Sequence, residues 1–174
     1  MKSYETANFR FDSAAQWSYL FYLVVGLIIL KSQALKSTVD WFCLLLAKLA
    51  FGLGSVFDSR LVREHSILYV EDYAHGIDIT PACGALIFSL VLITGVLTFK
   101  KKHIKALPLA IGAFLVIQAL NVLRILSLVY ARYFDHTTFD IIHEKMWPVV
   151  FSLVTAALFY KIVHVRNLPS TQKN

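Results

Sequence analysis

Residues 81–99 read PACGALIFSLVLITGVLTF, a stretch without a single charged side chain. A helix rises 1.5 Å per residue, so a segment of this length reaches about 28 Å, close to the ~30 Å hydrocarbon core of a bilayer. Inside lipid the backbone has no water to bind, and a helix satisfies its N–H and C=O groups within one segment. The stretch therefore predicts a transmembrane helix.

Four further apolar segments of similar length cover residues 14–30, 39–57, 106–130 and 146–163. Of the 174 residues, 57% are hydrophobic and 16% are charged, whereas soluble domains carry about 25% charged residues. We predict an all-α, polytopic transmembrane bundle of about five spans that forms one integral membrane domain over residues 1–174. The first segment has no small-residue cleavage site after it, so we expect it to be retained.

The basic residues indicate how the chain crosses the membrane. The net charge is +6, but these residues lie between apolar runs and form no stripe that would favour nucleic acid. Residues 31–36, 100–105 and the C-terminal tail collect nine basic residues, with Asp40 as the one acid on the same side, and the other connections collect six basic residues against ten acids. The positive-inside rule places the first group in the cytoplasm. We expect a multi-pass protein of the cell membrane, with its N-terminus outside if all five segments span.

Two connections are expected to be structured outside the membrane. Residues 58–80 contain short alternating patterns at 66–70 and 76–79, which predict an extracytoplasmic hairpin or ordered loop. Residues 131–145 form the second connection, where Thr137 and Asp140 have the spacing of a helix-capping box. We expect a short helix there, along the outer surface.

Cys83 is the first candidate for chemistry. Thr80 suits a helix N-cap and Pro81 suits the first helical position, which would place Cys83 in the first helical turn. Free backbone N–H groups there favour a thiolate. The alternative is a small packing residue, which is our interpretation of Cys43. With only two cysteines the chain has no disulfide framework and no zinc spacing, and we expect no metal and no cofactor.

Arg124 is the second candidate, because it lies several residues inside the outer end of the fourth span. A charge at mid-helix costs about 2.5–3.5 kcal/mol on insertion scales. Asn121 and Gln118 precede it by three and six residues and make a polar stripe on the same side of the helix. The alternative is snorkelling to the headgroups. Lys48 also interrupts a span but has no polar neighbours, so packing or snorkelling explains it better.

His143 is the third candidate. It stands directly before the fifth span, and Trp147 follows at the expected interface. His65, His75 and His136 are interpreted as solvated surface histidines. Separate spans thus deliver Cys83, Arg124 and His143 to one outer layer of the membrane.

These motifs together resemble the exosortase and archaeosortase membrane transpeptidases, in a compact form. That family has a Cys in a short helix-start motif, an Arg within an N-x-x-R-I type motif late in a following span, and a His ahead of an aromatic-rich span. The matching residues are Ala82-Cys83-Gly84, Asn121-Val122-Leu123-Arg124-Ile125, and His143 followed by Trp147 and Phe151. The resemblance covers about residues 76–151. It departs from the family in one place, because Gly84 follows Cys83 without the usual small polar residue between them.

The resemblance implies a membrane cysteine protease and transpeptidase. Such an enzyme cleaves C-terminal sorting signals of exported proteins at the extracytoplasmic membrane surface and transfers the new carboxyl end to an acceptor. Its partners would be exported substrates with a C-terminal motif, a transmembrane helix and a basic cluster, together with membrane lipid and without nucleic acid. Cys83 would be the nucleophile, Arg124 the charge stabiliser and His143 the proton donor, with Asn121 in support.

Two other interpretations remain. A non-catalytic assembly subunit or degenerate sortase-like module would use Asn121 and Arg124 to hold helices together. A small transporter would line a path with the same residues, but its usual broken half-helices and internal symmetry are not seen in the sequence.

Overall fold

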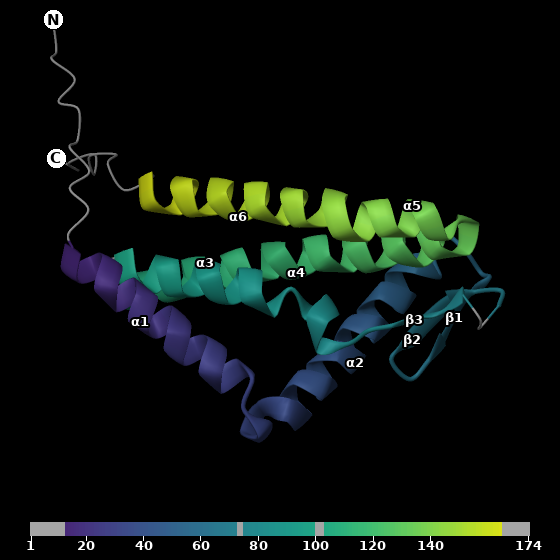
Figure 1. Ribbon diagram of the computed structural model, residues 1–174, viewed down its shortest axis with the longest axis horizontal. Coiled ribbons are helices and arrows are strands. Elements are labelled where there is room, and N and C mark those ends of the chain that lie inside the picture. The colour runs from purple at the N-terminus through teal and green to yellow at the C-terminus, as the bar shows by residue number, and fades with distance from the viewer. Residues whose placement is uncertain (1–12, 73–74, 100–102, 165–174) are drawn as a thin grey trace, which may run out of the picture.

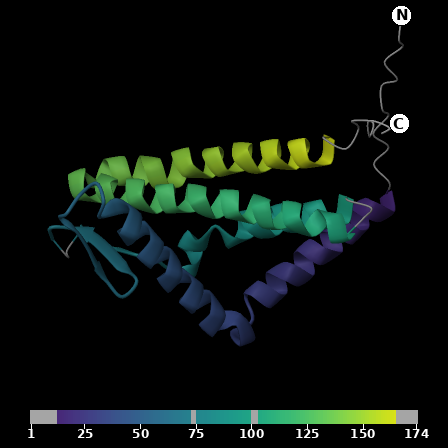
Figure 2. The same ribbon diagram turned by 180° about the vertical axis from the view of Figure 1, so that it is seen from behind.

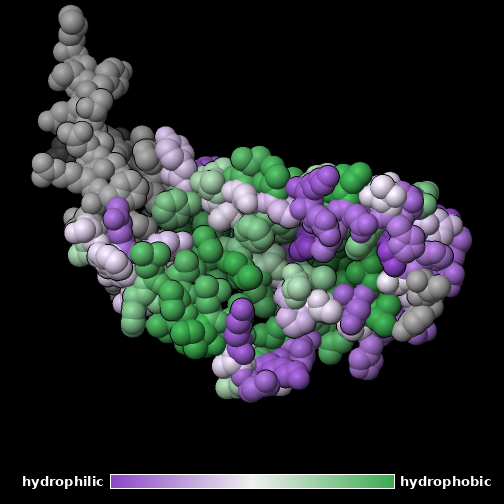
Figure 3. All heavy atoms as spheres, in the orientation of Figure 1, coloured by the Kyte–Doolittle hydropathy of each residue, from purple (hydrophilic) through white to green (hydrophobic). Residues whose placement is uncertain are grey.

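The computed structural model describes residues 13–72, 75–99 and 103–164, which form a helical bundle with a small sheet at one end (Figure 1). Helices α1 (Ser13–Leu30), α2 (Lys36–Gly54), α3 (Leu86–Phe99), α4 (His103–Phe134) and α6 (Trp147–His164) match the five predicted segments closely. Four helical stretches are long and apolar enough to cross a membrane, and the shorter Gln16–Leu30 joins them. The predicted transmembrane bundle is confirmed. Apolar side chains cover α1 and α3, and polar ones gather toward the sheet (Figure 3).

Helix α3 is packed between α1 and α6. A Cβ on Gly95 would come within 2.7 Å of Phe159 of α6 and 3.7 Å of Tyr19 of α1, so a glycine allows all three helices to approach. Gly26 of α1 meets Leu90 of α3 in the same way. Because Tyr19 faces Gly95 and Gly26 faces Leu90, α1 runs antiparallel to α3. The start of α1 and the end of α3 therefore lie at the same end of the bundle.

Helix α4 extends beyond α3 toward the end of the molecule that contains the sheet (Figure 2). Its C-terminal half packs against α2 and the sheet through a core cluster that includes Leu46, Ala50, Leu68, Ile125 and Val129. Its N-terminal part packs instead against α3 and α6. Helix α4 thus joins two packed parts of the molecule. One is the bundle that it forms with α3 and α6, and the other, called the end domain here, consists of α2 and the three strands.

The short helix predicted within 131–145 is present as α5, but its surroundings, its cap and its course differ from the prediction. Helix α4 continues to Phe134, α5 (His136–Asp140) follows, and a π-helical turn over Ile141–Met146 leads directly into α6. Asp135 caps α5 by accepting a hydrogen bond from the backbone N–H of Thr138 at 3.0 Å. The capping residue is therefore Asp135 and not Thr137, and the segment continues α6 instead of lying along the surface.

The predicted hairpin is present as a three-stranded antiparallel sheet. Strands β1 (Leu61–Glu64), β2 (Ile67–Val70) and β3 (Ile77–Asp78) lie in the order β1-β2-β3. Leu61 pairs with Val70, and Leu68 pairs with Ile77. Strand β3 leads directly to Thr80 and Cys83, so the sheet fixes the position of the segment that carries the candidate nucleophile.

An ionic cluster fastens the sheet to α4. Arg60 hydrogen-bonds Asp58 and Glu71 at 3.0 Å and 3.1 Å, and the hydroxyl of Tyr133 donates to Glu71 at 2.8 Å. The hydrogen bond from Arg60 lowers the pKa of the Asp58 carboxyl. The hydroxyl of Tyr133, followed by Arg60, lowers the pKa of Glu71. Both carboxylates are thus held ionised at the surface.

The bundle corrects one part of the predicted topology. The connection between α1 and α2 lies beside Pro81, at the end of the bundle where α6 begins. Residues 100–105 join α3 to α4 at the opposite end. These two basic connections therefore do not share one side, because α1 crosses the length of α3 between them. The expectation of an external N-terminus loses its basis.

Candidate active site

The segment that carries Cys83 is a short break before α3. Residues Pro81–Gly84 form a 3-10 turn, and Ala85 then adopts a left-handed conformation with φ 48° and ψ 25°. The backbone N–H of Cys83 donates to the carbonyl of Thr80 at 2.8 Å. Cys83 is therefore not in the first turn of a spanning helix, as the sequence predicted, and its N–H is not free. Thr80 takes the N-cap position but makes no side-chain capping bond among the described residues.

The Cys83 thiol is half-buried at the boundary of the end domain. Its Sγ lies 3.9 Å from the hydroxyl of Thr80 and 3.9 Å from the carbonyl oxygen of Asp78. It packs against the core cluster that contains Cys43, which is 3% exposed. The two thiols are close enough to interact electrostatically. Cys43 is thus a packing residue, as expected.

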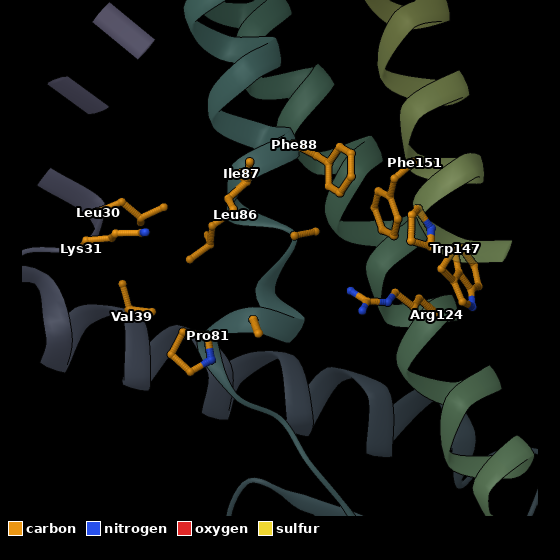
Figure 4. Close-up of a pocket in the computed structure, with 13 residues that line it drawn as sticks. Leu30, Lys31, Val39, Pro81, Leu86, Ile87, Phe88, Arg124, Trp147 and Phe151 are labelled. Atoms are coloured by element: carbon orange, nitrogen blue, oxygen red, sulfur yellow. The ribbon is translucent and has the colours of Figure 1, made fainter. Parts of the chain in front are cut away.

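Arg124 points from α4 into a cavity of about 330 Å³ beside this segment (Figure 4). Ala82 and Ala85 line the cavity on either side of Cys83, while Phe88, Trp147 and Phe151 form an apolar wall. The guanidinium carbon of Arg124 lies 5.9 Å from the ring centroid of Phe151. Its Nε is buried and has no hydrogen-bond partner among the described residues.

Arg124 is therefore directed into the cavity (Figure 4). It is close enough to Cys83 for direct electrostatic interaction. A buried donor without a partner costs about 1–3 kcal/mol.

Lys31 reaches into the same cavity from the opposite wall (Figure 4). No acidic side chain lines the cavity within the described part of the chain. Nothing in the sequence distinguished Lys31 as a site residue, because a lysine between two apolar segments indicates only membrane topology. Its place next to Leu30, at the end of α1, carried no motif that would have distinguished it.

Asn121 and Gln118 form a buried polar layer under the Cys83 segment. The side chain of Gln118 donates from Nε2 to the carbonyl of Gly84 at 3.2 Å and to the hydroxyl of Ser89 at 3.0 Å. Asn121 is 0% exposed and donates to Gln118 Oε1 at 3.5 Å. The predicted stripe exists, but it faces the Cys83 turn and α3 and does not line the cavity. Asn121 acts through Gln118, so its predicted role is a supporting one.

His143 lies outside the cavity as the described residues line it. It is half-buried in the π-helical turn and stacks on Phe139, with ring centroids 5.4 Å apart. Trp147, four residues later, does line the cavity, and its Nε1 donates to the hydroxyl of Ser127 at 2.9 Å. The structure thus brings Arg124 next to the Cys83 segment, and it places His143 outside the cavity, one helical turn before Trp147.

His136 contacts residues outside the candidate site. It is exposed, hydrogen-bonds Arg132, and lies with its ring centroid 6.4 Å from that of His75. This contact links α5 to the connection between β2 and β3. Among the described residues, no group of three His, Cys, Asp or Glu side chains is placed to hold a metal ion.

Comparison with known proteins adds one finding. A family model described as transmembrane exosortase (Exosortase_EpsH) matches residues 10–160, a wider region than the motifs at 76–151. No curated protein and no solved structure matches the chain.

Proposed function

Because this chain belongs to the transmembrane exosortase family, we propose that it is a membrane-embedded cysteine transpeptidase. It cleaves C-terminal sorting signals of exported proteins and passes the new carboxyl end to an acceptor. The observation that carries this proposal is the cavity in which Arg124 faces the Cys83 segment. An unpaired guanidinium near a thiol suits a reaction that develops negative charge.

The first chemical step forms an acyl-enzyme. The Cys83 thiolate attacks the carbonyl carbon of the scissile peptide bond, making a C–S bond and leaving negative charge on the carbonyl oxygen. Arg124 stabilises that charge, since its interaction is strong in a cavity lined mostly by apolar groups. The C–N bond then breaks, and the leaving nitrogen takes a proton from protonated His143.

The second step transfers the acyl group. A hydroxyl or amine of the acceptor attacks the thioester and gives its proton to the now neutral His143, and the Cys83 thiolate leaves. His143 is assigned this role because it stands one turn before Trp147, which lines the cavity. It also lies in a π-helical turn, a feature frequent at functional sites.

The charge of the connections supports an extracytoplasmic site. The ends of α1, α3, α4 and α6 away from the cavity are flanked in the sequence by residues 1–12, 100–105 and 161–174, which carry nine basic and two acidic residues. The connections at the cavity end carry six basic and nine acidic residues. The positive-inside rule then directs the cavity outward in the plasma membrane, with the N-terminus in the cytoplasm.

The partners are exported proteins that end in a short motif, a transmembrane helix and a basic cluster. Such a tail stops in the membrane with its motif at the outer surface, at the level of Arg124. We call a tagged protein of this kind, taken from the same genome, the tail reporter.

Two single substitutions test the nucleophile. Cys83→Ala is expected to abolish cleavage of the tail reporter in membranes, so that the uncleaved form accumulates. Cys43→Ala is the matched control, since it removes the other thiol from a buried site while leaving the cavity intact, and it should keep most cleavage. Normal cleavage by Cys83→Ala would leave the non-catalytic membrane module as the better account.

A further inference from the structure

The two cysteines of the chain meet in the core of the end domain. Cys43, on α2, is 3% exposed, and the half-buried Cys83 packs against the core cluster that contains it. Helix α2 contacts the turn Pro81–Gly84 that carries Cys83. The electrostatic interaction of Cys43 with Cys83 is larger than its interaction with Asp40, three residues away on the same helix. The two thiols are therefore neighbours in space although they are distant in the sequence.

The Cys83 thiol lies on the side of its turn that faces the end domain. Its Sγ is 3.9 Å from the carbonyl oxygen of Asp78, and Asp78 and Cys43 line one hollow of about 260 Å³. Cys83 itself is not among the described residues that line the cavity proposed as the active site, although Ala82 and Ala85 beside it are. The thiol must therefore turn toward the cavity to react with a substrate, and in the structure it lies against the cluster that contains the second thiol.

The contacts of the Cys83 sulfur are too weak to fix its orientation. Its neighbours are the hydroxyl of Thr80 and the carbonyl of Asp78, each at 3.9 Å. A thiol is a weak donor and a weak acceptor, so neither contact holds the sulfur firmly. Rotation of this side chain can therefore direct it either into the cavity or toward α2.

The difference in exposure gives the two thiols different roles. Cys83 is half-buried and can be reached by a reagent, whereas Cys43 is buried beside it. Reactive cysteines that are sensitive to oxidation often have such a second, resolving cysteine next to them. At an extracytoplasmic site, disulfides form and persist.

We propose that Cys43 is a resolving cysteine for Cys83, and that a disulfide-bearing oxidant at the outer surface joins the two as a Cys43–Cys83 disulfide. The disulfide occupies the nucleophile and stops cleavage until a dithiol reduces it. This inference rests on the proposed function, because it takes Cys83 as the nucleophile and the outer surface as its location.

The oxidation proceeds by two thiol–disulfide exchanges. The Cys83 thiolate attacks one sulfur of the oxidant, forming a mixed disulfide and releasing a first thiolate. That thiolate takes the proton of Cys43, whose sulfur then attacks Sγ of Cys83 and releases the second half of the oxidant. Both cysteines are oxidised, one disulfide is reduced to two thiols, and the protons of the two cysteines end on those thiols.

Oxidised glutathione tests the pairing in membranes that hold the full chain. After treatment, free thiols are blocked with N-ethylmaleimide, and peptides are analysed by mass spectrometry without reduction. The peptide of Cys43 should be joined to the peptide of Cys83, with no glutathione on either cysteine. Cleavage of the tail reporter should fall at least tenfold and return with dithiothreitol. Glutathione retained on Cys83 beside a free Cys43 thiol, or disulfides only between two copies of the chain, would overturn the proposal.

Moving the second thiol along α2 provides a matched control. Cys43→Ala combined with Ala50→Cys shifts it by seven residues, about 10 Å along the helix, to a position buried in the same cluster. A disulfide requires Cα atoms within about 7 Å of each other. This variant should cleave the reporter under reducing conditions, which shows that it folds, and after oxidation Cys83 should retain glutathione. Cys43→Ala alone should give the same adduct. An internal disulfide in the shifted variant at the yield of the wild type would refute a specific pairing.

Failure of this proposal and failure of the proposed function are distinguishable. The disulfide is detected by peptide mass and requires no cleavage of the reporter. If Cys83→Ala cleaves the reporter normally, the nucleophile assignment fails, and with it the blocking effect of any disulfide. If Cys83→Ala is inactive but the oxidised wild type contains no internal disulfide, the nucleophile stands and Cys43 is a packing residue alone.

Discussion

The side-chain nitrogen of Gln118 donates a hydrogen bond to the backbone carbonyl of Gly84 at 3.2 Å. This bond ties the middle of α4 to the residue that follows Cys83, across 34 positions of sequence. Ala85, the next residue, is buried and left-handed, a conformation that costs a non-glycine residue about 1–2 kcal/mol. Gln118 thus holds a strained turn whose geometry sets the position of the thiol.

Removing this bond should slow the enzyme without unfolding it. Gln118→Met keeps the length of the side chain and is expected to lower the cleavage rate about tenfold, equivalent to 1.4 kcal/mol, while Cys83 becomes more accessible to alkylation. Adding Ala85→Gly should restore part of the rate, because glycine adopts the left-handed conformation without steric cost. Thr98→Val is the control, since its buried hydroxyl also lacks a described partner but lies far along α3. If Gln118→Met behaves like Thr98→Val in both assays, Gln118 does not position the thiol.

A positive charge at position 124 should not be sufficient for cleavage, because the planar guanidinium is needed as well. Arg124→Lys keeps one positive charge but loses the planar fork of donors, including the unpaired Nε. We expect cleavage of the tail reporter to fall about a hundredfold or more, as on removal of an oxyanion donor. Lys48→Arg is the reverse exchange at an exposed site on α2 and should cleave normally. Full activity of Arg124→Lys would leave the residue a purely topological role.

His143 and His136 are predicted to differ sharply. His143→Ala removes the proposed proton donor, and general acid-base catalysis contributes about 10²- to 10⁴-fold, so most cleavage should be lost. Added imidazole should restore part of it, because the substitution leaves space beside Phe139. His136→Ala affects an exposed contact with Arg132 and should keep most activity. The reverse pattern, with His136→Ala inactive, would move the third role to His136.

The sheet should loosen in acid. The pKa values of Asp58 and Glu71 are lowered in the folded chain, so their stabilising effect is complete above the ordinary carboxyl value near 4. It is lost as the pH falls through the lower folded values. Protease cleavage between residues 58 and 72, followed by mass spectrometry, should therefore rise in strong acid.

Substitutions separate this ionic effect from general acid unfolding. Arg60→Leu should make the same segment sensitive already at neutral pH and flatten the pH dependence. Arg63→Leu is the control, since Arg63 donates to the carbonyl oxygen of His65 and not to these carboxylates. A wild-type pH dependence in Arg60→Leu would show that the cluster does not fasten the sheet.

Much of this protein was determined by local sequence. Uninterrupted apolar runs of about 20 residues have one stable form in lipid, so the helices at 14–30, 39–57, 81–99, 106–130 and 146–163 were predicted to within a few residues. Alternating residues at 66–70 and 76–79 predicted β2 and β3 for a similar reason, because a two-residue period is a local property, whereas β1 (Leu61–Glu64) was not predicted. The order of Cys83, Arg124 and His143 was enough to indicate the family.

Only the tertiary structure decided how these pieces meet. The chain turns left-handed at Ala85, where Gln118 of α4 donates hydrogen bonds to Gly84 and to Ser89 on either side of the turn, and no local pattern around Pro81 encodes this contact. Lys31 reaches the cavity because α1 crosses the whole length of α3, which charge counting over loops did not reveal. His143 lies one helical turn before Trp147 because α5 and the π-helical turn continue into α6 where a loop was expected. Which polar residues share one site depends on the crossing and register of helices, and these are set by packing between distant segments.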